Sequence, residues 1–85
     1  MNYSKFGSVK VKMTGIEWSR EGLPEKEEYS IGFDTLLQNG VVEESEDGMD
    51  WRMDEEGLRE LAKDMLEEDY RERPKDFLFM FSIVP

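Results

Sequence analysis

The side chains that could do chemistry in this chain are almost all carboxylates, because it contains no histidine and no cysteine. This composition removes the general base that titrates near neutral pH, the thiolate nucleophile and the common zinc ligands. Paired carboxylates can act as general acid and base, but one of them must be buried so that its pKa rises. Here the acids cluster at predicted turns and on the polar side of a predicted helix, without a phosphate loop or nucleophile elbow. The sequence predicts a protein that is not an enzyme, with no catalytic residue, metal site or cofactor.

The negative charge is concentrated in one segment. Residues 43–76 hold fifteen acids and six bases, so they carry −9 of the −10 net charge of the 85-residue chain. Because the acids are confined to this segment, they indicate a local acidic surface. Acids that serve only solubility would be spread over the chain. Strong acidity disfavours nucleic acid and anionic membranes as ligands and favours basic protein surfaces as partners.

An acidic row is predicted on the helix that follows Asp54. Glu56, Glu60, Asp64 and Glu68 recur at i, i+4 spacing, which places four like charges about 6 Å apart along the helix. Each like pair at this spacing destabilises an isolated helix by about 0.2–0.5 kcal/mol. Two explanations stay open: a solvated helix face, and a recognition surface.

An acidic hairpin with its turn at Asp47–Gly48 is predicted to extend this surface. Duplex DNA is a rigid rod with one charge about every 1.7 Å of its axis, so rigid rows of carboxylates can occupy the basic groove of a nucleic-acid-binding protein. Trp51 lies in the acidic stretch and is a candidate interface anchor, although it also fits a buried sheet face. A calcium loop over residues 43–54 fits poorly, so a plain acidic hairpin is favoured. The predicted partner-binding residues are Glu43, Glu44, Glu46, Asp47, Asp50, Trp51, Glu56, Glu60, Asp64, Glu67 and Glu68.

Strand patterns dominate the first half of the chain. Apolar residues alternate with polar ones from Phe6 to Ser19, and the alternation flips at Thr14-Gly15, which predicts one long strand with a β-bulge. After a loop over residues 20–26, residues 29–33 form a second predicted strand. For residues 34–40 an Asn39-Gly40 hairpin turn is favoured, and a helical turn capped by Asp34 and ending at Gly40 is the alternative.

The remaining elements are two short strands, the helix and a final strand. Residues 41–45 and 49–53 are predicted to pair as the acidic hairpin, and Asp54 is the predicted N-cap of the helix. Pro74 is predicted to end the helix. The last strand, residues 76–84, is apolar on both faces, which is typical of a strand inside a sheet that is covered on both sides. The apolar helix face comprises Leu58, Leu61, Ala62, Met65 and Leu66.

The fold class predicted from these patterns is α+β: an antiparallel sheet of four to five strands with one principal helix packed on one face, in the order ββββαβ. Residues 1–85 form a single small acidic α+β domain. The absence of cysteine, of an apolar signal region and of a membrane-spanning run predicts a cytoplasmic protein.

In size, acidity and lack of catalytic residues the chain resembles small phage- or plasmid-encoded inhibitors, such as anti-CRISPR proteins and antirestriction DNA mimics. The resemblance is one of composition, so no residue is carried over from it. It implies an inhibitor that occupies a positively charged, nucleic-acid-binding surface of a partner protein. Two alternatives are a structural or assembly protein that forms a homodimer or docks to a fixed partner through its sheet, and an acidic antitoxin or immunity protein.

Overall fold

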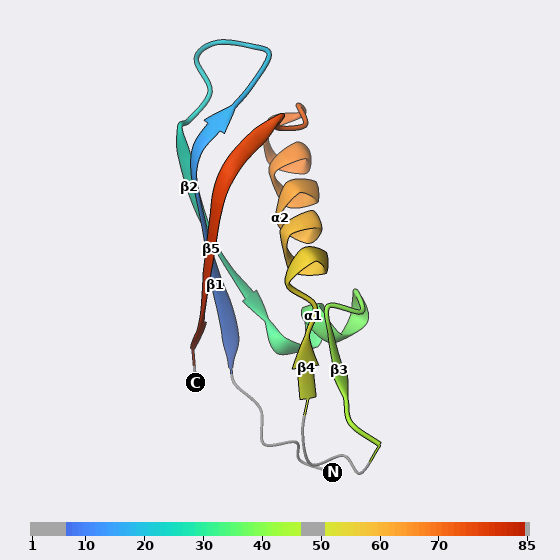
Figure 1. Ribbon diagram of the computed structural model, residues 1–85. Helices are drawn as coiled ribbons and strands as arrows, with labels where there is room; N and C mark the ends of the chain where they lie inside the picture. Colours follow the sequence, from blue (N-terminus) through green and yellow to red (C-terminus); the bar gives the residue numbers. More distant parts are fainter. Residues whose placement is uncertain (1–6, 47–50, 85) are drawn as a thin grey trace.

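The computed structural model describes residues 7–46 and 51–84, apart from the side chain of Glu44. It has two layers: a three-stranded antiparallel sheet, and a second layer that contains two helices and a two-stranded hairpin (Figure 1). The elements follow in the order β1, β2, α1, β3, β4, α2, β5. The α+β class and the single principal helix are confirmed. The predicted single sheet of four to five strands and the order ββββαβ are wrong.

The central strand of the sheet is β1 (Ser8–Glu17), which pairs with β2 (Lys26–Gly32) on one side and β5 (Asp76–Val84) on the other. Both pairings are antiparallel. Strand β5 is far from β1 in the sequence, so the central strand pairs with a distant segment of the chain.

Side chains of β1 alternate between a buried and an exposed face. Val9, Val11 and Met13 are fully buried against the second layer, whereas Lys10 and Lys12 are exposed on the other face. This alternation is the one that the sequence predicts for a half-buried strand.

The predicted bulge in β1 is confirmed at Gly15. The register with β5 shifts between Thr14 and Glu17, and Gly15 has a φ of +64°. Glycine adopts this left-handed conformation without the steric penalty that a Cβ brings. The extra residue restores the inward direction of Ile16, which is buried.

Residues 33–38 form a short helix, and the favoured prediction of a hairpin turn at Asn39-Gly40 is wrong. Helix α1 (Phe33–Gln38) begins after Gly32 and ends at Asn39, and Gly40 follows with a φ of +71°. The alternative helical turn is therefore correct, although Gly32 and not Asp34 occupies the N-cap position. Burial of Phe33 and Leu36 decided the outcome, because helical spacing brings both to one face.

Strands β3 (Val42–Glu44) and β4 (Trp51–Met53) pair with each other in a separate two-stranded sheet. The predicted pairing of these segments is confirmed, but they do not join the main sheet. The predicted turn at Asp47-Gly48 lies outside the described residues.

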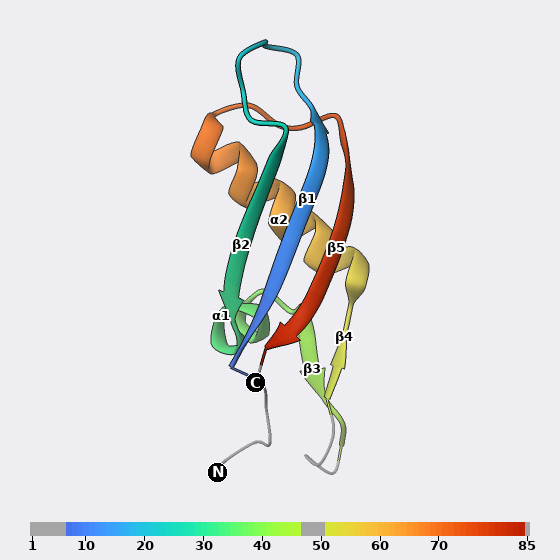
Figure 2. The same cartoon turned by 90° about the vertical axis from the view of Figure 1, so that its left-hand side faces the viewer.

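Helix α2 (Glu55–Tyr70) lies across one face of the sheet, diagonally to its strands (Figure 2). Leu58, Ala62 and Leu66 are fully buried, and Leu61 and Met65 pack partly against the core. Asp54 occupies the N-cap position as predicted, although its side chain forms no capping hydrogen bond.

The chain leaves α2 through Arg71, which has the left-handed φ of 57°. Its backbone N–H donates to the Glu67 carbonyl at 2.7 Å, which satisfies one of the last carbonyls of the helix. The turn reverses the chain, so Arg73 returns along the helix before β5 begins.

Strand β5 has the predicted bounds but not the predicted environment. In the part of the chain that the structure describes, it lies at an edge of the sheet with one face covered and the other open. Phe77, Phe79 and Phe81 point toward α2, whereas Leu78 is 72% exposed and Met80 is 68% exposed on the open face. The prediction of a strand covered on both sides is therefore wrong.

Candidate functional site

The predicted acidic row lies on the solvent side of α2. Glu56, Glu60, Asp64 and Glu68 are all exposed, because the opposite side of the helix carries the buried leucines. Glu67 is exposed beside the row. The helix therefore positions these five predicted residues on one surface.

Arg73 partly neutralises the centre of this row. Its guanidinium forms ion pairs with Glu67 at 2.8 Å, Asp64 at 3.0 Å and Glu60 at 3.1 Å. Hydrogen bonds to Glu67 and then Asp64 raise the pKa of Arg73. Sequence reasoning missed this contact, because it depends on the reversal of the chain after α2.

Glu56 and Glu68 remain at the two ends of the row. Within residues 7–46 and 51–84, neither carboxylate lies in an ion pair. The guanidinium of Arg73 pairs with the central acids, so Glu56 and Glu68 carry the uncompensated charge of the row. The pattern is therefore a fixed centre with two free acidic ends.

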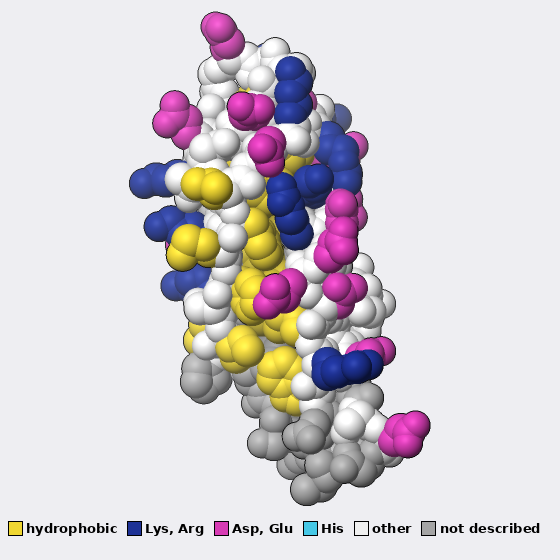
Figure 3. All heavy atoms as spheres, viewed as in Figure 1, with side chains coloured by type: hydrophobic (Ala, Val, Ile, Leu, Met, Phe, Trp, Pro, Cys, Tyr) yellow, Lys and Arg dark blue, Asp and Glu magenta, His cyan; other side chains and the backbone are white. Residues whose placement is uncertain are grey.

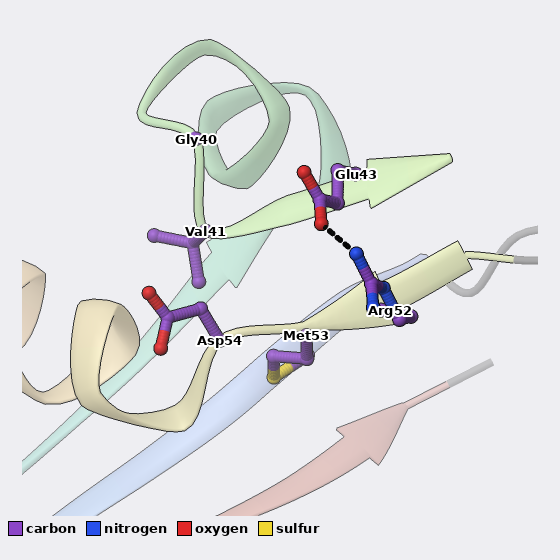
Figure 4. A pocket seen from close by; sticks show the side chains of 6 residues that line it. All are labelled: Gly40, Val41, Glu43, Arg52, Met53 and Asp54. Atoms are coloured by element: carbon purple, nitrogen blue, oxygen red, sulfur yellow. Dashed lines mark hydrogen bonds and ion pairs between the residues drawn. The ribbon is translucent and has the colours of Figure 1, made fainter. Parts of the chain in front are cut away.

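The hairpin acids are less well assembled. Glu43 projects from β3 and pairs with Arg52 of β4, across a shallow hollow beside the start of α2 (Figure 4). Glu46 is exposed, and Glu44 takes part in the hairpin through its backbone. Predicted residues Asp47 and Asp50 lie outside the described residues. The hollow is lined by Gly40, Val41, Glu43, Arg52, Met53 and Asp54.

Trp51 is held partly in the core. Its ring meets Phe33 edge to face, with the ring centroids 6.1 Å apart, and the residue is half-buried. This contact joins β4 to the start of α1 and stabilises the hairpin against the second layer. The structure therefore places Trp51 as a packing residue with only part of its ring available to a partner.

The open face of the sheet carries the opposite charge. Lys10 and Lys12 of β1 and Lys26 of β2 project from it, and Glu28 pairs with Lys10 at 3.5 Å. Figure 3 shows basic side chains projecting on the sheet side of the molecule, whereas acidic and basic side chains lie together on the helix side. The alternation of β1 predicts that Lys10 and Lys12 share a face, but the sequence does not reveal that this face is uncovered.

A set of tyrosine–carboxylate contacts joins β2 to the end of α2. The Tyr29 hydroxyl donates to Asp69, and the Tyr70 hydroxyl donates to Glu27. The hydrogen bond to Glu27 raises the pKa of Tyr70 to about 12, and burial followed by the bond to Asp69 raises the pKa of Tyr29 above its usual range. Both phenols are therefore neutral donors near pH 7.

Glu72 anchors the loop between β1 and β2. Its carboxylate accepts hydrogen bonds from the Ser19 hydroxyl, the Ser19 N–H at 2.5 Å and the Arg20 N–H at 3.0 Å. The bond from the Ser19 hydroxyl is the main cause that lowers the pKa of Glu72. A carboxylate held in its ionised form suits an acceptor that fixes a loop and not a proton donor.

No family model matches this chain, and no curated protein or solved structure matches it significantly. Function must therefore be argued from the arrangement of the described residues. In that part of the chain, no helix is long and apolar enough to cross a membrane.

Proposed function

We propose that this protein is a non-enzymatic inhibitor whose acidic surface, made by α2 and the β3–β4 hairpin, occupies a positively charged, nucleic-acid-binding surface of a partner protein. The observation that carries the proposal is the separation of charge between the two sides of the molecule. Acids line the outer side of α2, whereas Lys10, Lys12 and Lys26 project from the opposite face of the sheet. A basic partner is thus attracted more strongly to the acidic side than to the open face of the sheet, where Glu28 offsets part of the positive charge.

Arg73 supports the proposal by fixing the geometry of the acids. Its planar fork holds Glu60, Asp64 and Glu67 at defined positions on a rigid helix. Side chains that are ordered before binding lose less entropy in the complex. The row therefore presents a preorganised array at some cost in net charge at its centre.

The test is capture of partners from a lysate of the source cells on the immobilised protein, at low and at high salt. We expect the captured protein to bind duplex nucleic acid, to be displaced by added DNA and to be lost at high salt, because exposed charges are screened beyond about 10 Å at 0.1 M. The variant Glu56→Lys/Glu68→Lys should capture much less of it. These two acids are the right targets because reversing them leaves the Arg73 contacts intact.

The matched control is Glu21→Lys/Glu25→Lys, which makes the same change in net charge in the exposed loop between β1 and β2. The control should retain capture. Equal loss in both variants would show that only total charge matters, and capture of a partner that DNA does not displace would contradict the proposal. A toxin among the displaced partners would place the chain with acidic antitoxins or immunity proteins.

A second candidate function, assembly through the sheet, is favoured by one observation. The open face of the sheet exposes Leu78 and Met80 next to Lys12 of the neighbouring strand. Exposed apolar side chains beside an unpaired strand edge are typical of a surface that binds another chain.

A further inference from the structure

We propose that the free edge of β5 binds an extended segment of a partner protein, in which apolar and acidic residues alternate, as an additional strand of the sheet. This edge is separate from the acidic row of α2. The proposal deepens the second candidate function above, assembly through the sheet, and does not depend on the inhibitor function.

Along this edge, the backbone of β5 has groups that pair with no other strand of the described residues. The Gly7 N–H donates to the Val84 carbonyl at 2.9 Å, so that carbonyl is turned toward β1. Backbone groups alternate in direction along an antiparallel strand, and the register of residues 78–84 with β1 has no shift. The N–H and C=O groups of Phe79, Phe81 and Ile83 therefore point away from β1, at the side where β5 is the last strand of its sheet.

The two edges of the sheet differ in their protection against pairing. At the other edge, β2 begins with Lys26, Glu27 and Glu28, and charged side chains are a common defence of edge strands. Residues 77–84 of β5 contain neither a charge nor a proline. The start of β2 is thus protected by charged side chains, and β5 has no such protection beyond Asp76.

The second layer extends past the β5 edge. In Figure 2 the first turn of α2 and the β3–β4 hairpin lie beyond β5, behind the plane of the sheet. Figure 3 shows hydrophobic side chains gathered in a strip between the sheet and α2. The rings of Phe77, Phe79 and Phe81 follow one another with centroids 6.3 and 6.2 Å apart. A strand beside β5 would place every second side chain against these rings, so apolar residues fit there.

Basic side chains flank the uncharged strand on both of its faces. On the helix side, Arg59 lies 4.4 Å from the centre of the Phe77 ring and pairs with Asp76. Lys63 follows one helical turn later and pairs with Glu60. On the open face, Lys12 is in register with Met80, and Lys10, which pairs with Glu28 on its other side, is in register with Ser82. The side chains of an added strand that face outward would approach these lysines, so acidic residues fit at the alternate positions.

A second copy of the chain fits this edge less well. In a symmetric dimer that pairs β5 with β5, each overhanging α2 would meet its counterpart near the two-fold axis. The first turns carry Asp54, Glu55 and Glu56, so like charges would face one another. A single extended segment avoids this encounter.

The experiment is selection of peptides from a phage-displayed random library on the immobilised full chain, followed by affinity measurements with a synthetic peptide of the enriched sequence. We expect enrichment of peptides in which apolar and acidic residues alternate. Ile83→Pro should weaken binding of that peptide by about tenfold or more, because it removes an outward N–H and leaves the pairing with β1 in place. The matched control is Ser30→Pro. Lys10 is paired with Ser30 of β2 and with Ser82 of β5, and its backbone groups point toward Ser82. The N–H of Ser30 therefore points away from β1, toward the free edge of β2.

A second variant separates lost binding from damaged folding. Met80→Glu changes an exposed side chain and adds a negative charge beside the proposed strand, so it should weaken binding while Ser30→Glu does not. Circular dichroism checks that each variant is folded. Peptides without the alternating pattern, or affinity that is unchanged in both β5 variants, would overturn the proposal. Light scattering that shows a dimer, abolished by Ile83→Pro but not by Ser30→Pro, would also overturn it by making the second copy the occupant.

Discussion

At the scale of single residues, Arg73 changes how the acidic row of α2 should be understood. The i, i+4 spacing alone suggests four like charges that repel one another, but the guanidinium bridges Glu60, Asp64 and Glu67. Recognition by this surface then depends most on its two ends, Glu56 and Glu68. The spacing of the acids could be predicted from the sequence, whereas the partner that neutralises them could not, because its position depends on the turn at Arg71.

Glu72 should make the stability of the protein sensitive to acid. Its pKa is lowered in the folded state, so its contribution is present above the unfolded value of about 4.3 and is lost as the pH falls through the folded value. Glu72→Gln should lower the melting temperature at pH 7, and the difference from wild type should shrink below pH about 4. Melting curves across this range test the prediction, with Glu21→Gln as an exposed control. A difference that is constant with pH would contradict it.

Tyr70 should titrate only in strong alkali. Its hydrogen bond to Glu27 raises its pKa to about 12, so the contact contributes stability below the unfolded value of about 10 and loses it as the pH rises through the folded value. Ultraviolet absorbance of the phenolate measures this ionisation. In Glu27→Gln the tyrosine should ionise at lower pH, because the accepting carboxylate has gone. An unchanged titration curve would show that the contact is absent in solution.

At the scale of elements, two glycines should respond to alanine in opposite directions. Gly57 lies in α2, where alanine is favoured by about 0.8–1 kcal/mol, and its new Cβ would meet only the exposed Asp54 side chain, with the carboxylate oxygen 2.9 Å away. We expect Gly57→Ala to stabilise the protein. Gly15→Ala should destabilise it by about 1–2 kcal/mol, because Gly15 has a left-handed φ in the bulge. Chemical denaturation measures both, and destabilisation by Gly57→Ala would show that Asp54 cannot move aside.

Helix α1 can be tested with two neighbouring leucines. Leu36 is fully buried and Leu37 is exposed. Leu36→Ala should cost about 2–5 kcal/mol in the free energy of unfolding, whereas Leu37→Ala should cost less than about 1 kcal/mol. Equal costs in denaturant melts would contradict the burial of Leu36 and the exposure of Leu37 that this position of α1 produces.

The elements that could be predicted from the sequence are those with a long, regular apolar pattern. The bulge at Gly15, the bounds of β5 and the N-cap of α2 were correct because each depends on neighbouring residues. The pattern of residues 33–40 fits both a hairpin turn and a helical turn, and burial of Leu36 in the tertiary fold selected the helix. The apolar pattern of β5 indicates a buried strand, but its position at the sheet edge depends on pairing with the distant β1.

At the scale of the whole molecule, the net charge of −10 should make stability depend on salt. The Cα radius of gyration is 14.2 Å, so many like charges lie within a few Debye lengths of one another at low ionic strength. Screening weakens this repulsion, and we expect the melting temperature to rise between about 0.01 and 0.15 M NaCl. A falling melting temperature would show that favourable ion pairs, such as those of Arg73, outweigh the repulsion.

The two-sided distribution of charge could be predicted only in part. The concentration of acids in residues 43–76 is visible in the sequence, and the alternation of β1 indicates that Lys10 and Lys12 share a face. Their separation onto opposite sides of the molecule follows from the choice of face on which α2 packs. That choice depends on long-range contacts of β1 and β5, which no local pattern specifies.

The pairing of β1 with β5 also constrains the order of events during synthesis. The ribosome releases β1 well before β5, although β5 is one of the two neighbours of this central strand. Until then β1 and β2 can form only a hairpin, and a two-stranded hairpin is at best marginally stable in water. Contacts this distant in sequence slow folding, because a large loop must close before they form. The nascent chain therefore exposes Val9, Val11 and Met13 to chaperones and proteases until translation has passed Val84.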